Sequence, residues 1–146
     1  LDRHRVDEVA TSAVIVLDAD ATITEARELV GRSPPHQGFP VVERDEHLVG
    51  VIMRRELMAA TDEQAPVRSL VSREPVVVFA DSTLRAAVQQ MTEQRVGRLP
   101  VVSRTAPHGL IGILTRKDIV GIHVRDVRAA ARERTIQLRR PRRRPR

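Results

Sequence analysis

Three short blocks of this sequence occur twice, in the same order and at nearly constant spacing. They are an Ala-Asp-x-Thr block, a Pro-Val-Val block and a Leu-x-Gly block. The matched pairs are 19–23 with 80–84, 38–42 with 98–102, and 48–52 with 110–114. Such a repeat indicates two copies of one supersecondary unit, neither of which buries its apolar face alone. We therefore expect two similar halves that pack against each other.

Each half has the same predicted order of elements, β-α-β-β-α. A short apolar run rich in β-branched residues is typical of a buried strand, and the Asp-x-Thr step after it supplies a helix N-cap. The helix that follows is expected to end at Gly31 in the first half and near Gly97 in the second. The predicted strands are 14–17, 39–42, 48–52, 76–79, 99–102 and 110–114, with short closing helices from Arg54 and Arg116. The sequence thus predicts an α+β fold with pseudo-twofold symmetry.

The charge is distributed unevenly along the expected domains. These are a first domain at 6–60, a linker at 61–66, a second domain at 67–123, a helix at 124–138 and an Arg/Pro-rich tail at 139–146. Residues 125–146 hold ten Arg and two acidic residues, a net charge of +8, whereas 1–124 hold 15 basic and 17 acidic residues, a net charge of −2. Because a nucleic-acid-binding fold carries its basic patch within the domain, nucleic acid is not the expected partner. For the tail, contact with anionic lipid, a partner domain or nucleic acid remains an alternative to a free tail.

The composition limits the chemistry. Hydrophobic residues make up 41% of the chain and aromatic residues 1%, so the core must be aliphatic. The absence of Cys excludes disulfides, thiolate metal sites and Cys nucleophiles. His4, His47, His108 and His123 share no ligand spacing, so no metal site is assigned. We find no Ser-His-Asp set, no paired catalytic carboxylates and no Gly-rich phosphate loop, and we expect no enzymatic activity.

The second half ends in a recognisable motif, Gly-Ile-Leu-Thr-Arg-Lys-Asp at 112–118. It resembles the G-h-h-[ST]-x-x-D signature of CBS domains, where h is apolar, and the upstream Pro-Val-Val and Asp-x-Thr blocks agree with that family. The resemblance covers residues 6–123 and identifies a tandem CBS pair. It implies a regulatory module that senses adenine nucleotides, with a homodimer formed through the CBS pairs.

A finer resemblance lies at 36–42, which reads His-Gln-Gly-Phe-Pro-Val-Val. This segment is similar to the first CBS domain of CLC-type chloride channels and transporters, which carry such a pair on the cytoplasmic side after the membrane part. The chain begins with Leu1 and no initiator Met, which fits a piece of a longer parent chain with a transmembrane transporter domain. The resemblance therefore implies a cytoplasmic location. CBS pairs also occur in magnesium transporters, nucleotide-biosynthesis enzymes and stand-alone regulators.

The motif at 112–118 has the chemistry to bind a nucleotide. Asp118 can accept hydrogen bonds from both ribose hydroxyls, and Thr115 and the intervening cations lie beside it at a helix start suited to phosphate. By the family resemblance, the base is bound by the first strand of the other unit and the residues before its Pro-Val strand. The predicted nucleotide-binding residues are Ala13, Val14, Ile15, His36, Gln37, Gly38, Thr115, Arg116, Lys117 and Asp118. We expect one ATP, ADP or AMP per chain.

The equivalent cleft of the first motif is expected to be degenerate. Met53 stands where the signature has a hydroxyl residue, and Glu56 stands where it has Asp. Met cannot donate a hydrogen bond to phosphate, and Glu moves the carboxylate by about one bond length. The residues of this second site are Met53, Glu56, Pro75, Val76 and Arg98. Although Arg98 favours phosphate, we expect this cleft to be weak or empty.

Plainer interpretations stand beside these. Asp118 can interact with a helix dipole, Thr115 can cap the same helix, and His36 can be an exposed loop residue. The leading hypothesis is a regulatory nucleotide-binding module of a chloride channel or transporter. The alternatives are a structural dimerisation module without a ligand and a stand-alone CBS regulatory protein.

Overall fold

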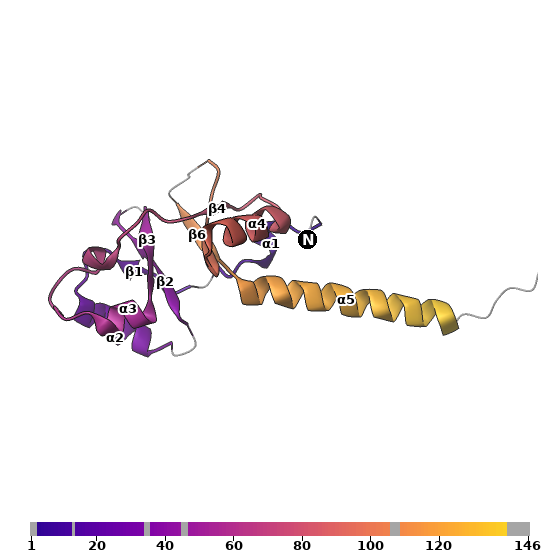
Figure 1. Cartoon of the computed structure of the whole chain (residues 1–146), viewed down its shortest axis with the longest axis horizontal. Helices are drawn as coiled ribbons and strands as arrows, with labels where there is room; N and C mark the ends of the chain where they lie inside the picture. The colour runs from indigo at the N-terminus through magenta and orange to yellow at the C-terminus, as the bar shows by residue number, and fades with distance from the viewer. Residues whose placement is uncertain (1–2, 13, 34–35, 45–46, 106–108, 140–146) are drawn as a thin grey trace, which may run out of the picture.

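The structure is a computed structural model, and it describes residues 3–12, 14–33, 36–44, 47–105 and 109–139. Two similar halves lie side by side, and a long helix extends from the second half (Figure 1). Each half contains one three-stranded sheet with helices packed on it. The predicted α+β fold of two repeats is therefore confirmed. The Arg/Pro-rich tail at 140–146 lies outside the described residues.

The two sheets have the same topology. In the first half the elements are β1 (Leu17–Asp18), α2 (Ile23–Gly31), β2 (Gly38–Val42), β3 (Leu48–Met53) and α3 (Arg54–Ala59). In the second half they are β4 (Val78–Phe79), α4 (Leu84–Gln94), β5 (Arg98–Val102), β6 (Leu110–Thr115) and α5 (Arg116–Arg139). The first strand of each sheet runs parallel to the second, and the second runs antiparallel to the third. Gly38 pairs with Met53, and Arg98 pairs with Thr115 at the equivalent place.

The first strand of each half is shorter than the sequence predicts. The apolar runs 14–17 and 76–79 indicated strands of four residues, whereas β1 and β4 each contain two. The residues ahead of β1 are half-buried, and Val14 lines a small cavity with Leu110 of the other half. Ile15 and Val76, which precede β1 and β4, pack against the core of their own half. The apolar character of these runs therefore serves core packing, which a sequence pattern does not distinguish from strand pairing.

Threonine caps the main helix of each half, as the Asp-x-Thr steps indicated. The Thr22 hydroxyl accepts a hydrogen bond from the Glu25 backbone N–H at 3.1 Å, and the Thr83 hydroxyl accepts one from the Ala86 N–H at 3.1 Å. Helix α2 ends at Gly31, as predicted. Helix α4 ends at Gln94, earlier than the Gly97 expected, because the next residue adopts a left-handed conformation with φ of 55°.

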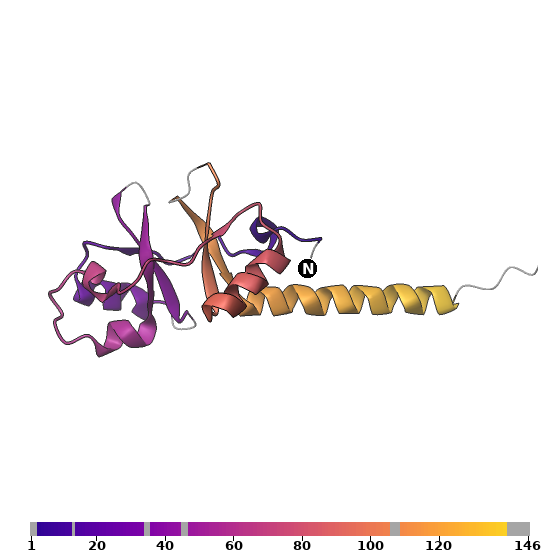
Figure 2. The ribbon, with the colours of Figure 1, turned by 45° about the horizontal axis from the view of Figure 1, so that its top comes forward.

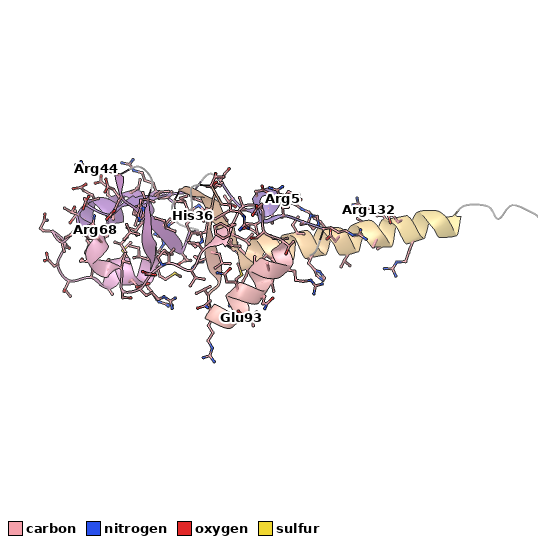
Figure 3. The ribbon with its side chains drawn as sticks, turned by 90° about the horizontal axis from the view of Figure 1, so that it is seen from above. Arg5, His36, Arg44, Arg68, Glu93 and Arg132 are labelled. Carbon is pink, nitrogen blue, oxygen red and sulfur yellow. The ribbon has the colours of Figure 1, made fainter. Side chains whose placement is uncertain are left out.

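The halves exchange their leading segments. Helix α1 (Val6–Val9) belongs to the first half in sequence, yet the Val6 N–H donates to the Ser82 carbonyl at 2.8 Å. The short 3-10 helix η2 (Val67–Leu70) follows the linker, yet the Val67 N–H donates to the Ala21 carbonyl of the first half at 2.8 Å. Figure 3 accordingly shows Arg68 beside the first half. Val6 and Val67 are fully buried in the second and first core respectively. This exchange links the two cores.

A single continuous helix is the last element that the structure describes. The prediction of a short helix near Arg116 and a separate helix at 124–138 is wrong, because α5 runs unbroken through 24 residues from Arg116 to Arg139. No Pro interrupts this stretch, and one internal glycine costs only about 1 kcal/mol. The helix projects beyond the body (Figure 2). His4 contacts Asp126 at 3.1 Å, and 127–134 are exposed. Among the described residues, no helix is both long enough and apolar enough to span a membrane.

Candidate functional site

Thr115 and Asp118 form a reciprocal cap at the start of α5. The Asp118 Oδ2 accepts hydrogen bonds from the Thr115 backbone N–H at 2.9 Å and from its hydroxyl at 3.0 Å. In return, the Asp118 N–H donates to the Thr115 hydroxyl oxygen at 3.3 Å. Both residues are half-buried, and no described residue donates to Asp118 Oδ1. The cap fixes the carboxylate and leaves one oxygen able to accept from a ligand.

The first half repeats this arrangement with different atoms. The Glu56 Oε1 accepts a hydrogen bond from the Met53 backbone N–H at 3.0 Å, so the longer side chain reaches the same position relative to the backbone. The Met53 sulfur accepts a hydrogen bond from Arg98 Nη1 at 3.1 Å. The substitution of Met for a hydroxyl residue thus replaces a possible phosphate donor with a soft acceptor for a guanidinium.

A cavity of about 530 Å³ lies at this first motif. It is lined by residues of β3 and α3 on one side and by the segment before β4 and the start of β5 on the other, so both halves form its wall. All five residues predicted for the second site line it, namely Met53, Glu56, Pro75, Val76 and Arg98. Its volume is in the range of small-molecule sites, which measure roughly 300–1,000 Å³.

Arg98 is the innermost charged residue of this cavity. Its side chain is half-buried, and burial together with the nearby Arg116 guanidinium lowers its pKa from the ordinary arginine value. The side chain crosses Gly38, where an added Cβ would lie 2.5 Å from the Arg98 Cδ. Glycine at 38 therefore makes room for the Arg98 stem. Arg98 and Gly38, predicted in two different clefts, are in contact with each other.

The remaining predicted residues do not all gather at Asp118. Ala13 lies outside the described residues. Val14 and Leu110 line a cavity of about 230 Å³, and this cavity lies at the opposite end of β6 from Thr115. Ile15 is half-buried.

The loop before β2 is anchored to the first half. The backbone carbonyls of His36 and Gln37 accept hydrogen bonds from Arg54, at 2.8 Å from its Nε and 2.7 Å from its backbone N–H. Both side chains are exposed, and Figure 3 shows His36 near the middle of the molecule. Arg116 and Lys117 are exposed on the first turn of α5. The structure thus unites Thr115 with Asp118 but shows no contact between this pair and His36 among the described residues.

Three arginines of the cavity wall were not predicted from the sequence. Arg55, Arg73 and Arg95 also line the cavity at the first motif, and all three are exposed. Each lies within three residues of a predicted site residue, which is the signal that could have found them. They come from three different segments, and only the fold brings them to one wall. Among the described residues, no group of three His, Asp or Glu side chains is close enough to hold a metal ion.

The protein is thus a tandem repeat with a cavity of small-molecule size that residues of both halves line. The model of the CBS domain family matches the chain twice, at residues 6–63 and 67–127. The chain therefore belongs to the CBS domain family.

Relatives and solved structures agree with this assignment. The chain is 33% identical over 116 residues to an inosine-5'-monophosphate dehydrogenase from Methanocaldococcus jannaschii, covering 80% of this chain but 23% of that enzyme. It is 26% identical to a CBS domain-containing protein from Dictyostelium discoideum, covering 82% of this chain and 91% of the relative. Among solved structures, CBSX2 in complex with AMP superposes with a TM-score of 0.72 at 27% identity, covering 84% of this chain and 97% of CBSX2.

Proposed function

We propose that this protein is a regulatory module that binds an adenine nucleotide between its two CBS repeats and has no catalytic role of its own. The observation that carries the proposal is the cavity of about 530 Å³ to which both halves contribute, with a carboxylate and a half-buried guanidinium in its wall. The AMP bound by CBSX2, at 27% identity, supports an adenine nucleotide as the ligand.

Regulation follows from a ligand site that both halves form. A nucleotide that touches both walls binds best to one arrangement of the halves, and it shifts the population toward that arrangement. The size of the effect equals the difference in binding free energy between the two arrangements. Because the cavity is lined by Leu70 of η2, which packs on the first core, and by β5, which contributes to the second core, a change at the cavity would be passed to both cores.

Asp118 is the ribose-binding residue that we propose for the cleft of the second motif. Its fixed Oδ2 and its open Oδ1 suit a ribose with two neighbouring hydroxyls. The residues proposed from the sequence to surround it are Ala13, Val14, Ile15, His36, Gln37, Gly38, Thr115, Arg116 and Lys117. Of these, Val14 lines the cavity at the other end of β6, and Gly38 contacts Arg98. Calorimetry with ATP, ADP and AMP on Asp118→Ala tests this assignment, with Glu133→Ala on the exposed part of α5 as the control. Asp118→Ala should lose the binding event of this cleft, and unchanged binding would remove the assignment.

Two settings for the module are proposed. The segment 36–42 supports the cytoplasmic regulatory part of a CLC-type channel or transporter, in which the module would also dimerise through its CBS pairs. The 91% coverage of the Dictyostelium relative supports a stand-alone regulatory protein instead. The gene sequence upstream of Leu1 separates them, because a channel parent requires hydrophobic spans there and a stand-alone protein does not.

A module that binds no ligand and serves only dimerisation is the competing function. The replacements Met53 and Glu56 in the first motif favour it. A thermal unfolding experiment separates the two, because a ligand that binds only the native state must raise the melting temperature. No shift with ATP, ADP or AMP, combined with a dimer in sedimentation, would support the structural role.

A further inference from the structure

We infer that the cavity at the first motif takes a ligand with two or more phosphate groups, so that it favours ADP and ATP over AMP. The inference rests on the proposed function for the nucleotide part of the ligand. It departs from the expectation, based on Met53 and Glu56 alone, that this cleft is weak or empty.

The cavity wall carries an excess of positive charge. Four arginines line it, Arg55, Arg73, Arg95 and Arg98, against two carboxylates, those of Glu56 and Glu74. The arginines come from α3, from the segment before β4, from the C-cap of α4 and from the first residue of β5. Residues 1–124 together hold more acidic than basic residues, so this concentration is a local feature and does not follow from the composition of the body.

These arginines lack the carboxylate partners that several other arginines of the body have. Arg5 pairs with Asp7 at 2.7 Å, Arg68 with Asp20 at 2.8 Å, and Arg104 with Asp81 at 2.8 Å. Within the described parts of the chain, none of the four cavity arginines forms a salt bridge. Neighbouring cations repel one another, and an anion bound among them removes that repulsion.

Arg98 is the clearest case. Its Nη1 donates to the neutral sulfur of Met53 at 3.1 Å, a weak acceptor, and the other charge that affects it is the Arg116 guanidinium. Burial and that cation both lower the pKa of Arg98. Guanidinium groups bind phosphate with two parallel hydrogen bonds, so a phosphate would supply the strong acceptor that Arg98 lacks.

The distribution of exposure indicates more than one phosphate. Arg98 is half-buried, whereas Arg55, Arg73 and Arg95 are exposed on the rim of the cavity. A single phosphate bound at Arg98 would leave the rim arginines without an anion. A chain of phosphates that runs outward from Arg98 can contact the rim as well. Apolar residues such as Val76 and Pro100 line the same cavity and offer a surface for a base.

The test is isothermal titration calorimetry on the full chain with ATP, ADP, AMP and inorganic tripolyphosphate. The variant is Arg73→Gln/Arg98→Gln, and the control is Arg128→Gln on the exposed part of α5. We expect the double variant to weaken ATP binding by about tenfold or more and AMP binding by about threefold or less. The control should bind like the wild type. An unchanged melting temperature of the double variant shows that it is folded, and ATP affinity should fall as salt is added.

The outcomes separate the inference from the proposed function. Equal affinity for AMP and ATP, with no selective effect of the double variant, overturns the polyphosphate preference and leaves nucleotide binding intact. Binding of tripolyphosphate without any nucleotide overturns the proposed function and retains a polyanion site. If Asp118→Ala loses ATP binding while Arg73→Gln/Arg98→Gln retains it in full, the nucleotide binds in the cleft of the second motif. That result overturns the inference.

Discussion

Replacing Gly112 by alanine should destabilise the protein in a way that can be worked out from the structure. Gly112 lies in β6, and an alanine Cβ there would be 2.5 Å from the backbone carbonyl oxygen of Thr11. Because the obstacle is backbone, no side-chain rotation relieves the clash. The segment at Thr11 would have to move away from β6, where it forms two hydrogen bonds of 2.9 Å with Ile113.

The magnitude follows from those two hydrogen bonds. Each is worth about 0.5–1.5 kcal/mol to stability, so Gly112→Ala should cost roughly 1–3 kcal/mol. Gly121 supplies a matched control, because an added Cβ there meets nothing within 4 Å. It lies inside α5 and is exposed, so Gly121→Ala should stabilise the protein by up to about 1 kcal/mol through helix propensity.

Urea unfolding followed by circular dichroism measures both variants. With a denaturant dependence of about 1–3 kcal/mol per molar urea, Gly112→Ala should lower the unfolding midpoint by roughly 1 M. Gly121→Ala should leave the midpoint unchanged or raise it. If Gly112→Ala unfolds at or above the wild-type midpoint, the close approach of the N-terminal segment to β6 does not exist as described.

Two further predictions concern packing and charge. Val67→Ala should lower the free energy of unfolding by about 2 kcal/mol, because Val67 is fully buried. Since η2 packs on the first core, hydrogen exchange should rise more in α2 than in α4. Val127→Ala, on the exposed part of α5, is the control, and equal exchange in both helices would contradict the segment exchange. The Arg104 guanidinium lowers the pKa of Asp81 in the folded protein from its ordinary value of 3.8. The ion pair therefore stabilises the protein fully at pH values above 3.8. This stabilisation disappears as the pH falls through the pKa that Asp81 has in the folded state. An NMR titration of Asp81 should show a lower pKa in the wild type than in Arg104→Gln, and identical values would refute the pairing.

The repeat itself was predictable because its pattern is local. The blocks at 19–23 and 80–84 contain the Thr caps of α2 and α4, and the helical spacing of buried apolar residues follows directly after them. The exchange of α1 and η2 could not be read in the same way. Val6 and Val67 lie beside their own halves in sequence, and only tertiary hydrogen bonds to Ser82 and Ala21 reveal where they pack.

The candidate site was predictable in its motif residues and less so in its surroundings. Thr115 and Asp118 lie three residues apart at a strand-to-helix junction, so their hydrogen bonds follow from a short segment. The cavity arginines come from separate segments, and only Arg98 among them was predictable, because it lies in the repeated block. Met53 and Glu56 alone predict a weak cleft, because the charges of Arg55, Arg73 and Arg95 reach the cavity only through the fold.

Calorimetric titration of the full chain with ATP most directly tests the claim that the two repeats together bind an adenine nucleotide. We expect saturable binding accompanied by a rise in the melting temperature, because a ligand of the native state stabilises it. We also expect weaker binding of AMP than of ATP at low salt. Absence of heat and of any shift in melting temperature, with a protein that circular dichroism shows to be folded, would contradict the claim.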